Sequence, residues 1–161
     1  MNIRTIGPIE YSDTQRQRFR NGELVALWKR RYPAIFDDDD VRLALSQPSA
    51  HFGEWLAAIT IFNATGHLSL LEKYALPSHR RKLRLFEKIV PKEQRDLMDA
   101  HPVVVQSPDL FVYSEDRKDW YYCEVKVDSD RLRPKQITFF ERIMEITGRP
   151  VFSMEFKKAK S

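Results

Sequence analysis

The chain has 161 residues, of which 42% are hydrophobic and 12% aromatic, so it can bury the core of one domain and is too apolar to be disordered throughout. Its 27 Lys and Arg residues exceed its 23 Asp and Glu residues, and the net charge of +4 suits a polyanionic partner without specifying one. The single cysteine, Cys123, excludes an internal disulfide and a cysteine-based zinc site, and no apolar run reaches the length of a membrane span.

The expected compartment follows from the cysteine content and from the N-terminal segment. One cysteine suits a reducing environment, and the N-terminus shows no apolar segment of the secretory type. We therefore expect a cytoplasmic protein without a membrane anchor.

The first 48 residues are expected to form an N-terminal helical extension. Residues 1–12 contain Gly7-Pro8 and are expected to be irregular, whereas residues 14–31 have the periodicity of a helix. The apolar stripe of that helix comprises Phe19, Leu24, Leu27 and Trp28. The run Asp37–Asp40 suits the acidic first turn of a short helix, with a cation held by four carboxylates as the alternative.

Residues 49–161 are expected to form the core of the domain. The predicted elements are a helix at 50–64, a strand at 67–72, a helical segment at 79–100 with a break at Pro91, strands at 108–113 and 119–127, a helix at 134–147 and a strand at 151–156. A short apolar segment, Val103–Val105, leads into the strand at 108–113. This order predicts an α/β fold with a mixed sheet.

An acid and a lysine share one face of the strand at 119–127. Side chains alternate along a strand, so Glu124 and Lys126 point one way while Cys123 and Val125 point into the core. From this strand alone, an ion pair on the protein surface is the simpler interpretation.

Asp109 adds a second carboxylate to this region. It opens the strand before the hairpin, and antiparallel pairing would bring it within reach of Glu124, although a turn-capping role after Pro108 is the alternative. Two carboxylates can hold a Mg²⁺ ion, which activates water and neutralises charge during phosphodiester hydrolysis. A lysine beside the metal can orient that water.

These residues resemble the motif of a known nuclease superfamily. Pro108-Asp109 followed by Glu124-Val125-Lys126 resembles the PD-(D/E)XK motif, and Asp130-Arg131-Leu132 with Gln136 resembles its VRR-NUC branch. The turn Val127-Asp128-Ser129 departs from the small residues usual in that branch. The resemblance implies a restriction-endonuclease-like core: a mixed four-stranded sheet flanked by helices.

The resemblance also implies roles for individual residues. Glu54, on the first core helix, resembles the third carboxylate of the superfamily, although the helix dipole alone would favour a glutamate there. Gln136 is the first-turn residue beside the site, where an ordinary helix residue is the alternative. The implied metal ligands are Glu54, Asp109, Glu124 and the carbonyl of Val125, and the implied catalytic residues are Asp109, Glu124, Lys126 and Gln136.

We therefore expect an endonuclease that uses Mg²⁺ (or Mn²⁺) to hydrolyse DNA, with branched or junction DNA among its candidate substrates and a homodimer as its candidate assembly. Candidate phosphate contacts are Arg131, Arg133, Lys135, Arg80 and Arg81. The alternative is a non-catalytic nucleic-acid-binding or interaction subunit on the same fold. The four histidines, His51, His67, His79 and His101, show no metal-ligand spacing and are interpreted as incidental.

Overall fold

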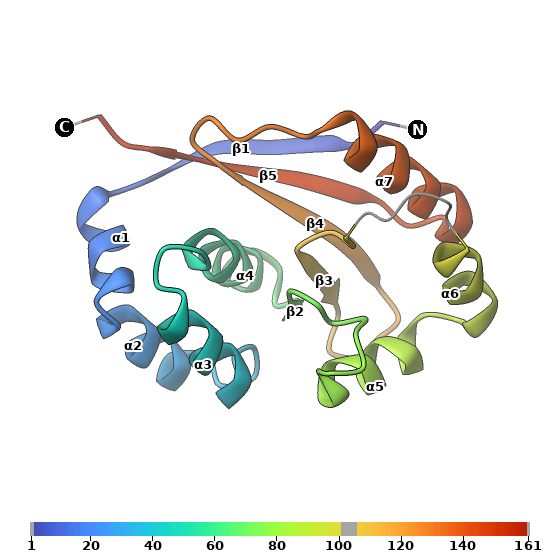
Figure 1. Cartoon of the computed structure of the whole chain (residues 1–161), viewed down its shortest axis with the longest axis horizontal. Helices are drawn as coiled ribbons and strands as arrows, with labels where there is room; N and C mark the ends of the chain where they lie inside the picture. Colours follow the sequence, from blue (N-terminus) through green and yellow to red (C-terminus); the bar gives the residue numbers. More distant parts are fainter. Residues whose placement is uncertain (1, 101–105, 161) are drawn as a thin grey trace.

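The computed structural model, which describes residues 2–100 and 106–160, has a mixed α/β fold with an open five-stranded sheet and helices on both of its faces (Figure 1). The strand order is β1-β5-β4-β3-β2. The β1–β5 and β4–β5 pairs are parallel, whereas β2–β3 and β3–β4 are antiparallel. The predicted segment Val103–Val105 lies outside the described residues.

The described residues form five strands and seven helices. The strands are β1 (Arg4–Tyr11), β2 (Leu68–Leu71), β3 (Leu110–Tyr113), β4 (Trp120–Val127) and β5 (Val151–Lys158). The helices are α1 (Asp13–Arg20), α2 (Glu23–Arg31), α3 (Asp38–Ser46), α4 (Phe52–Thr65), α5 (Arg80–Ile89), α6 (Lys92–Asp99) and α7 (Pro134–Thr147). None of the helices within the described ranges is long and apolar enough to cross a membrane.

The N-terminal strand β1 corrects two predictions. Residues 1–12 were expected to be irregular and the sheet to have four strands, but β1 pairs with β5 and adds a fifth strand at the edge. Most β1 side chains are exposed, so the strand has no buried apolar face that would show as alternation in the sequence. Its register shifts between Ile6 and Ile9, and a Cβ on Gly7 would lie 2.5 Å from the carbonyl oxygen of Glu155.

The predicted helix at 14–31 is divided in two. Gly22 has a φ of +88° and separates α1 from α2, which one continuous periodic pattern did not indicate. The predicted stripe is otherwise confirmed, because Phe19, Leu24 and Trp28 are buried and Leu27 packs against the same cluster. The helical segment at 79–100 breaks at Pro91, as predicted.

Two apolar clusters cover the two faces of the sheet. On one face, α1, α2 and α4 contribute Phe19, Trp28 and Trp55, which share a core with Val125 of β4 and with the predicted small hydrophobe Cys123. On the other face, α5 and α7 pack over the aromatic side chains of β3 and β4. The central strands β3 and β4 are therefore buried between two helical layers, whereas the edge strand β1 is largely exposed.

The acidic run at residues 37–40 begins α3, as predicted. Asp37 and Asp40 form a reciprocal capping box, in which each side chain accepts a hydrogen bond from the other's backbone N–H. Asp40 is buried with Lys82 of α5 at 2.6 Å, and that ammonium also donates to the carbonyl of Leu71 at 2.7 Å. The ammonium of Lys82 therefore occupies the position at Asp40 where the alternative interpretation placed a metal cation.

Candidate metal centre

The β3–β4 hairpin brings Asp109 and Glu124 together. Leu110 pairs with Cys123, which places Asp109 beside Glu124 at the open end of the hairpin. The backbone N–H of Asp109 donates to Glu124 Oε1 at 3.1 Å, and the backbone N–H of Val125 donates to Asp109 Oδ2 at 2.8 Å. The two predicted carboxylates are thus held by each other's strands.

Lys126 and Gln136 meet the second oxygen of Glu124. Lys126 Nζ lies 3.0 Å from Glu124 Oε2, and Gln136 Nε2 donates to the same oxygen at 2.8 Å. All three side chains are buried, which is rare for a lysine and a glutamate unless they are paired. Gln136 occupies the first turn of α7, where its Oε1 accepts from the backbone N–H of Arg133 and from Lys126. The surface ion pair considered for this strand is therefore wrong for Glu124 and Lys126.

Helix α4 brings a third predicted carboxylate to the same region. The helix approaches β4 closely at Gly53, where a Cβ would lie 2.7 Å from Val127 Cγ2, and the buried Ala57 and Ala58 continue this contact face. One oxygen of Glu54, Oε2, is buried without a hydrogen-bond partner among the described residues. A buried acceptor of this kind is destabilising unless another group satisfies it.

The pKa values of the carboxyls show that they share one electrostatic environment. Burial, followed by the negative charges of Glu72 and Glu124, raises the pKa of Glu54 to about 7. Burial, followed by the charges of Glu124 and Glu54, raises the pKa of Asp109 well above its ordinary value. Ionising these carboxyls together is therefore unfavourable unless a cation lies between them.

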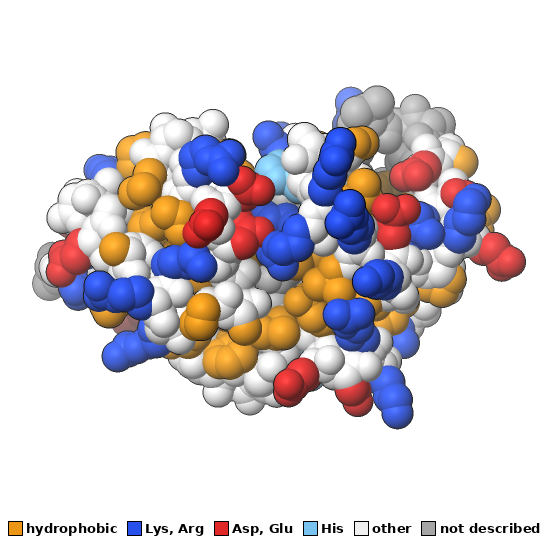
Figure 2. Space-filling model, turned by 90° about the horizontal axis from the view of Figure 1, so that it is seen from below, with side chains coloured by type: hydrophobic (Ala, Val, Ile, Leu, Met, Phe, Trp, Pro, Cys, Tyr) orange, Lys and Arg blue, Asp and Glu red, His pale blue; other side chains and the backbone are white. Residues whose placement is uncertain are grey.

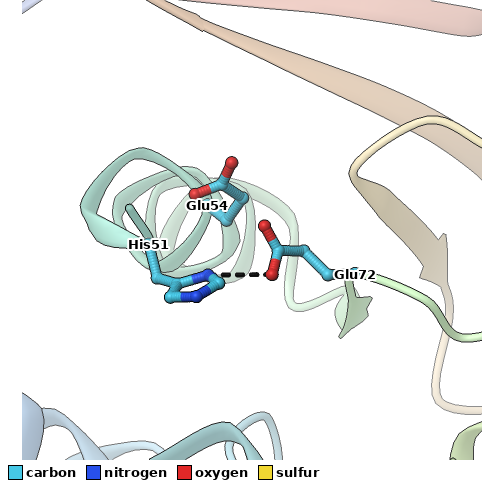
Figure 3. Close-up of side chains that lie close together, drawn as sticks. All are labelled: His51, Glu54 and Glu72. Carbon is cyan, nitrogen blue, oxygen red and sulfur yellow. Dashed lines mark ion pairs between the residues drawn. The ribbon is translucent and has the colours of Figure 1, made fainter. Parts of the chain in front are cut away.

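Two residues that the sequence did not single out complete the cluster. Glu72 follows β2, and its backbone N–H donates to the carbonyl of Asp109 at 2.8 Å. His51 precedes α4, and its Nδ1 lies 2.8 Å from Glu72 Oε2. Figure 3 shows the His51 ring and the Glu72 carboxylate facing each other, with Glu54 beside them on α4, and one ligand atom from each of the three residues lies within 4.8 Å of the other two.

His51 thus belongs to a candidate ligand group, whereas His67 contacts the Tyr121 hydroxyl at 2.9 Å. His101 lies outside the described residues. A signal for His51 existed in its three-residue spacing from Glu54, which places both at the same end and side of a helix. Nothing in the sequence linked Glu72 to them, because the link runs through β-sheet pairing.

A cleft of about 770 Å³ gives access to the cluster. It lies between the α3–α4 turn, the segment after β2, and helices α5 and α6, and its lining includes His51, Glu72 and Asp109. Lys73, Arg95, Glu87 and Asp99 also line it, and Arg95 forms an ion pair with Glu87 at 3.0 Å.

The predicted basic residues lie in two exposed places. Arg131, Arg133 and Lys135 belong to the segment between β4 and Gln136, next to the carboxylates, and Arg131 donates to backbone carbonyls of its own loop. Arg80 and Arg81 begin α5, where Arg81 forms an ion pair with Asp37 at 2.7 Å. Figure 2 shows many Lys and Arg side chains on the face seen from below, with carboxylates among them.

Comparisons with protein-family models, with curated proteins and with solved structures each find no match to this chain. The geometry and chemistry of the carboxylate cluster are therefore the grounds for a function.

Proposed function

We propose that this chain is a metal-dependent nuclease of the PD-(D/E)XK type, related in its motif to the VRR-NUC branch, that hydrolyses DNA phosphodiester bonds with Mg²⁺ or Mn²⁺. The observation that carries the proposal is the contact of Asp109 and Lys126 with Glu124, near Glu54, whose charge contributes to raising the pKa of Asp109. On this proposal, the mixed sheet and its flanking helices are a restriction-endonuclease-like core with an additional edge strand.

The donor set fits the proposed metal. Mg²⁺ prefers oxygen ligands, and Glu54, Asp109, Glu124 and the carbonyl of Val125 would supply only oxygens. A divalent cation would satisfy the unpartnered oxygen of Glu54 and offset the charges that raise the pKa of Asp109. Lys126 contributes one positive charge to this group.

The residues of the chain have distinct parts in the proposed reaction. The bound metal would supply Lewis acidity, lowering the pKa of a water and neutralising phosphate charge. Lys126, fixed by Glu124 and Gln136, would donate a hydrogen bond to the attacking water or to a phosphoryl oxygen. Asp109 is oriented by the N–H of Val125, so its carboxylate needs little rearrangement to bind a cation.

DNA is the proposed substrate, and the exposed Arg131, Arg133 and Lys135 are the proposed contacts to phosphates beside the scissile bond. Branched or junction DNA suits a nuclease that acts as a homodimer, because a symmetric pair would present one site to each strand. A non-catalytic nucleic-acid-binding or interaction subunit on this fold is the competing function.

Cleavage by paired lysine variants tests the proposal. Purified protein is incubated with linear, flapped and four-way-junction DNA in Mg²⁺, in Mn²⁺ and in EDTA. We expect cleavage only with metal, a loss on the order of 100-fold for Lys126→Met, and unchanged cleavage for Lys118→Met at an exposed turn.

Binding without cleavage of any substrate would instead support the non-catalytic subunit. Equal cleavage by wild type and Lys126→Met would refute the assigned site.

A further inference from the structure

We propose that His51, Glu54 and Glu72 bind a second divalent cation, of the transition-metal class represented by Mn²⁺ and Zn²⁺, beside the site of Asp109 and Glu124. Two of these three ligands take no part in the proposed Mg²⁺ site. The second site therefore does not require that the chain cut DNA, and it can be tested by metal binding alone.

The positions of the ligand atoms suit one ion. An imidazole nitrogen of His51 and a carboxylate oxygen from each of Glu54 and Glu72 lie within 4.8 Å of one another. Ligand atoms about 2 Å from a common ion are separated by about 3–4 Å, so small side-chain rotations would complete the coordination. Figure 3 shows that the two carboxylates approach from different elements, Glu54 from α4 and Glu72 from the end of β2.

The hydrogen bond between His51 Nε2 and Gln47 orients the ring so that Nδ1 faces the carboxylates. Its Nε2 lies 3.1 Å from Gln47 Oε1, which can accept only if Nε2 carries the proton. Nδ1 lies 2.8 Å from Glu72 Oε2, so in the metal-free protein it donates its own proton to that carboxylate, and a bound metal would replace this proton. Metal-binding histidines commonly have their second nitrogen fixed by such an acceptor.

The buried oxygen of Glu54 is an independent indication of a missing ligand. Glu54 Oε2 has no hydrogen-bond partner among the described residues, although its neighbours include two other carboxylates. Glu72 and Lys73 adopt positive φ values of 29° and 55°, which non-glycine residues rarely adopt. Such sparsely populated backbone conformations cluster at ligand sites, and here they coincide with a candidate ligand.

The chemistry of the donors selects the class of metal. One imidazole nitrogen with two carboxylates suits Mn²⁺, Fe²⁺ or Zn²⁺ better than Mg²⁺, which prefers oxygen alone. Two divalent cations among Glu54, Glu72, Asp109, Glu124 and Lys126 would leave one positive charge, which a single phosphodiester would neutralise. A second cation therefore agrees with an anionic ligand in the cleft.

Mn²⁺ binding to the metal-free, full-length protein tests this site. Electron paramagnetic resonance counts bound Mn²⁺, and electron spin-echo modulation detects a ¹⁴N nucleus coordinated to it. For wild type we expect two bound ions and a ¹⁴N signal. For His51→Ala we expect loss of the ¹⁴N signal and at least a 10-fold weaker affinity for one ion.

Matched variants separate a ligand from a structural residue. Glu72→Gln should lose the same ion without removing the histidine, and Gln47→Leu should weaken it about 10-fold because Gln47 positions His51 without touching the metal. His67→Ala and Glu87→Gln should bind Mn²⁺ as wild type does, and Glu87 lines the same cleft.

Bound Mn²⁺ without a ¹⁴N signal in wild type, an unchanged signal in His51→Ala, or no bound Mn²⁺ would each overturn the proposal. A single bound ion that keeps its ¹⁴N signal in Asp109→Asn would support this site while contradicting the metal site of the proposed nuclease.

Discussion

Replacing Glu54 by glutamine should stabilise the metal-free protein. The folded structure holds the pKa of Glu54 at about 7, above an ordinary value of 4.5, mainly because the carboxyl is buried. At about 1.4 kcal/mol for each pKa unit, ionising Glu54 in the folded protein costs about 3 kcal/mol of stability. Glutamine is nearly isosteric and uncharged, so it removes this cost.

The sign of the effect depends on pH. A raised carboxyl pKa means that the folded state binds the proton more tightly than the unfolded state does. The contribution of the Glu54 proton to the free energy of unfolding is therefore fully present in wild type below pH 4.5. It is lost as the pH rises through 7. The advantage of Glu54→Gln should be about 3 kcal/mol at pH 8 and below about 1 kcal/mol at pH 5.

Urea unfolding in EDTA at both pH values measures this difference, with Glu87→Gln at an exposed position of α5 as the control. Mn²⁺ at about 1,000 times its Kd should reverse the order, because it stabilises wild type by about 4.1 kcal/mol and the variant lacks a shared metal ligand. A variant that is less stable than wild type in EDTA at pH 8 would refute the reasoning, since Glu54 would then be satisfied within the protein.

Three further predictions concern packing, the buried ion pair and DNA contacts. Gly53→Ala should push α4 away from β4, which lowers the free energy of unfolding by about 1–3 kcal/mol and weakens Mn²⁺ binding. An unchanged free energy in urea unfolding and an unchanged Mn²⁺ affinity in calorimetry would contradict the close contact. Lys82→Met should cost about 3–5 kcal/mol because it leaves Asp40 buried without its partner, and a loss below 1 kcal/mol in urea would show that Asp40 is accommodated otherwise. Arg131→Ala and Arg133→Ala should each reduce the slope of log affinity against log salt by about 1, and unchanged slopes would exclude them as phosphate contacts.

Most elements could be predicted from the sequence because their apolar residues face a buried layer. The α7 helix begins at Pro134 and ends before Gly148, as these two residue types predict, and β4 coincides with the strongest strand pattern. The edge strand β1 could not be predicted in this way, since its exposed side chains leave no periodic signal. Gly22 was missed because a glycine inside a periodic segment marks a break only when its backbone adopts a positive φ.

Some residues of the candidate site could be predicted from local sequence patterns, and others could not. Asp109, Glu124 and Lys126 were found because a hairpin and side-chain alternation relate them locally, and the structure places all three in contact through Glu124. Glu72 was not predicted because sheet pairing, and not sequence spacing, brings it to Asp109. His51 was dismissed for lacking histidine neighbours, although its partners are carboxylates.

Anomalous diffraction from a crystal soaked in Mn²⁺ tests the metal centre most directly. The account predicts a peak about 2 Å from carboxylate oxygens of Glu54, Asp109 and Glu124, with Lys126 beside it. A map without density at these three carboxylates, in a protein whose other sites bind Mn²⁺, would contradict the assignment of this cluster as the catalytic centre.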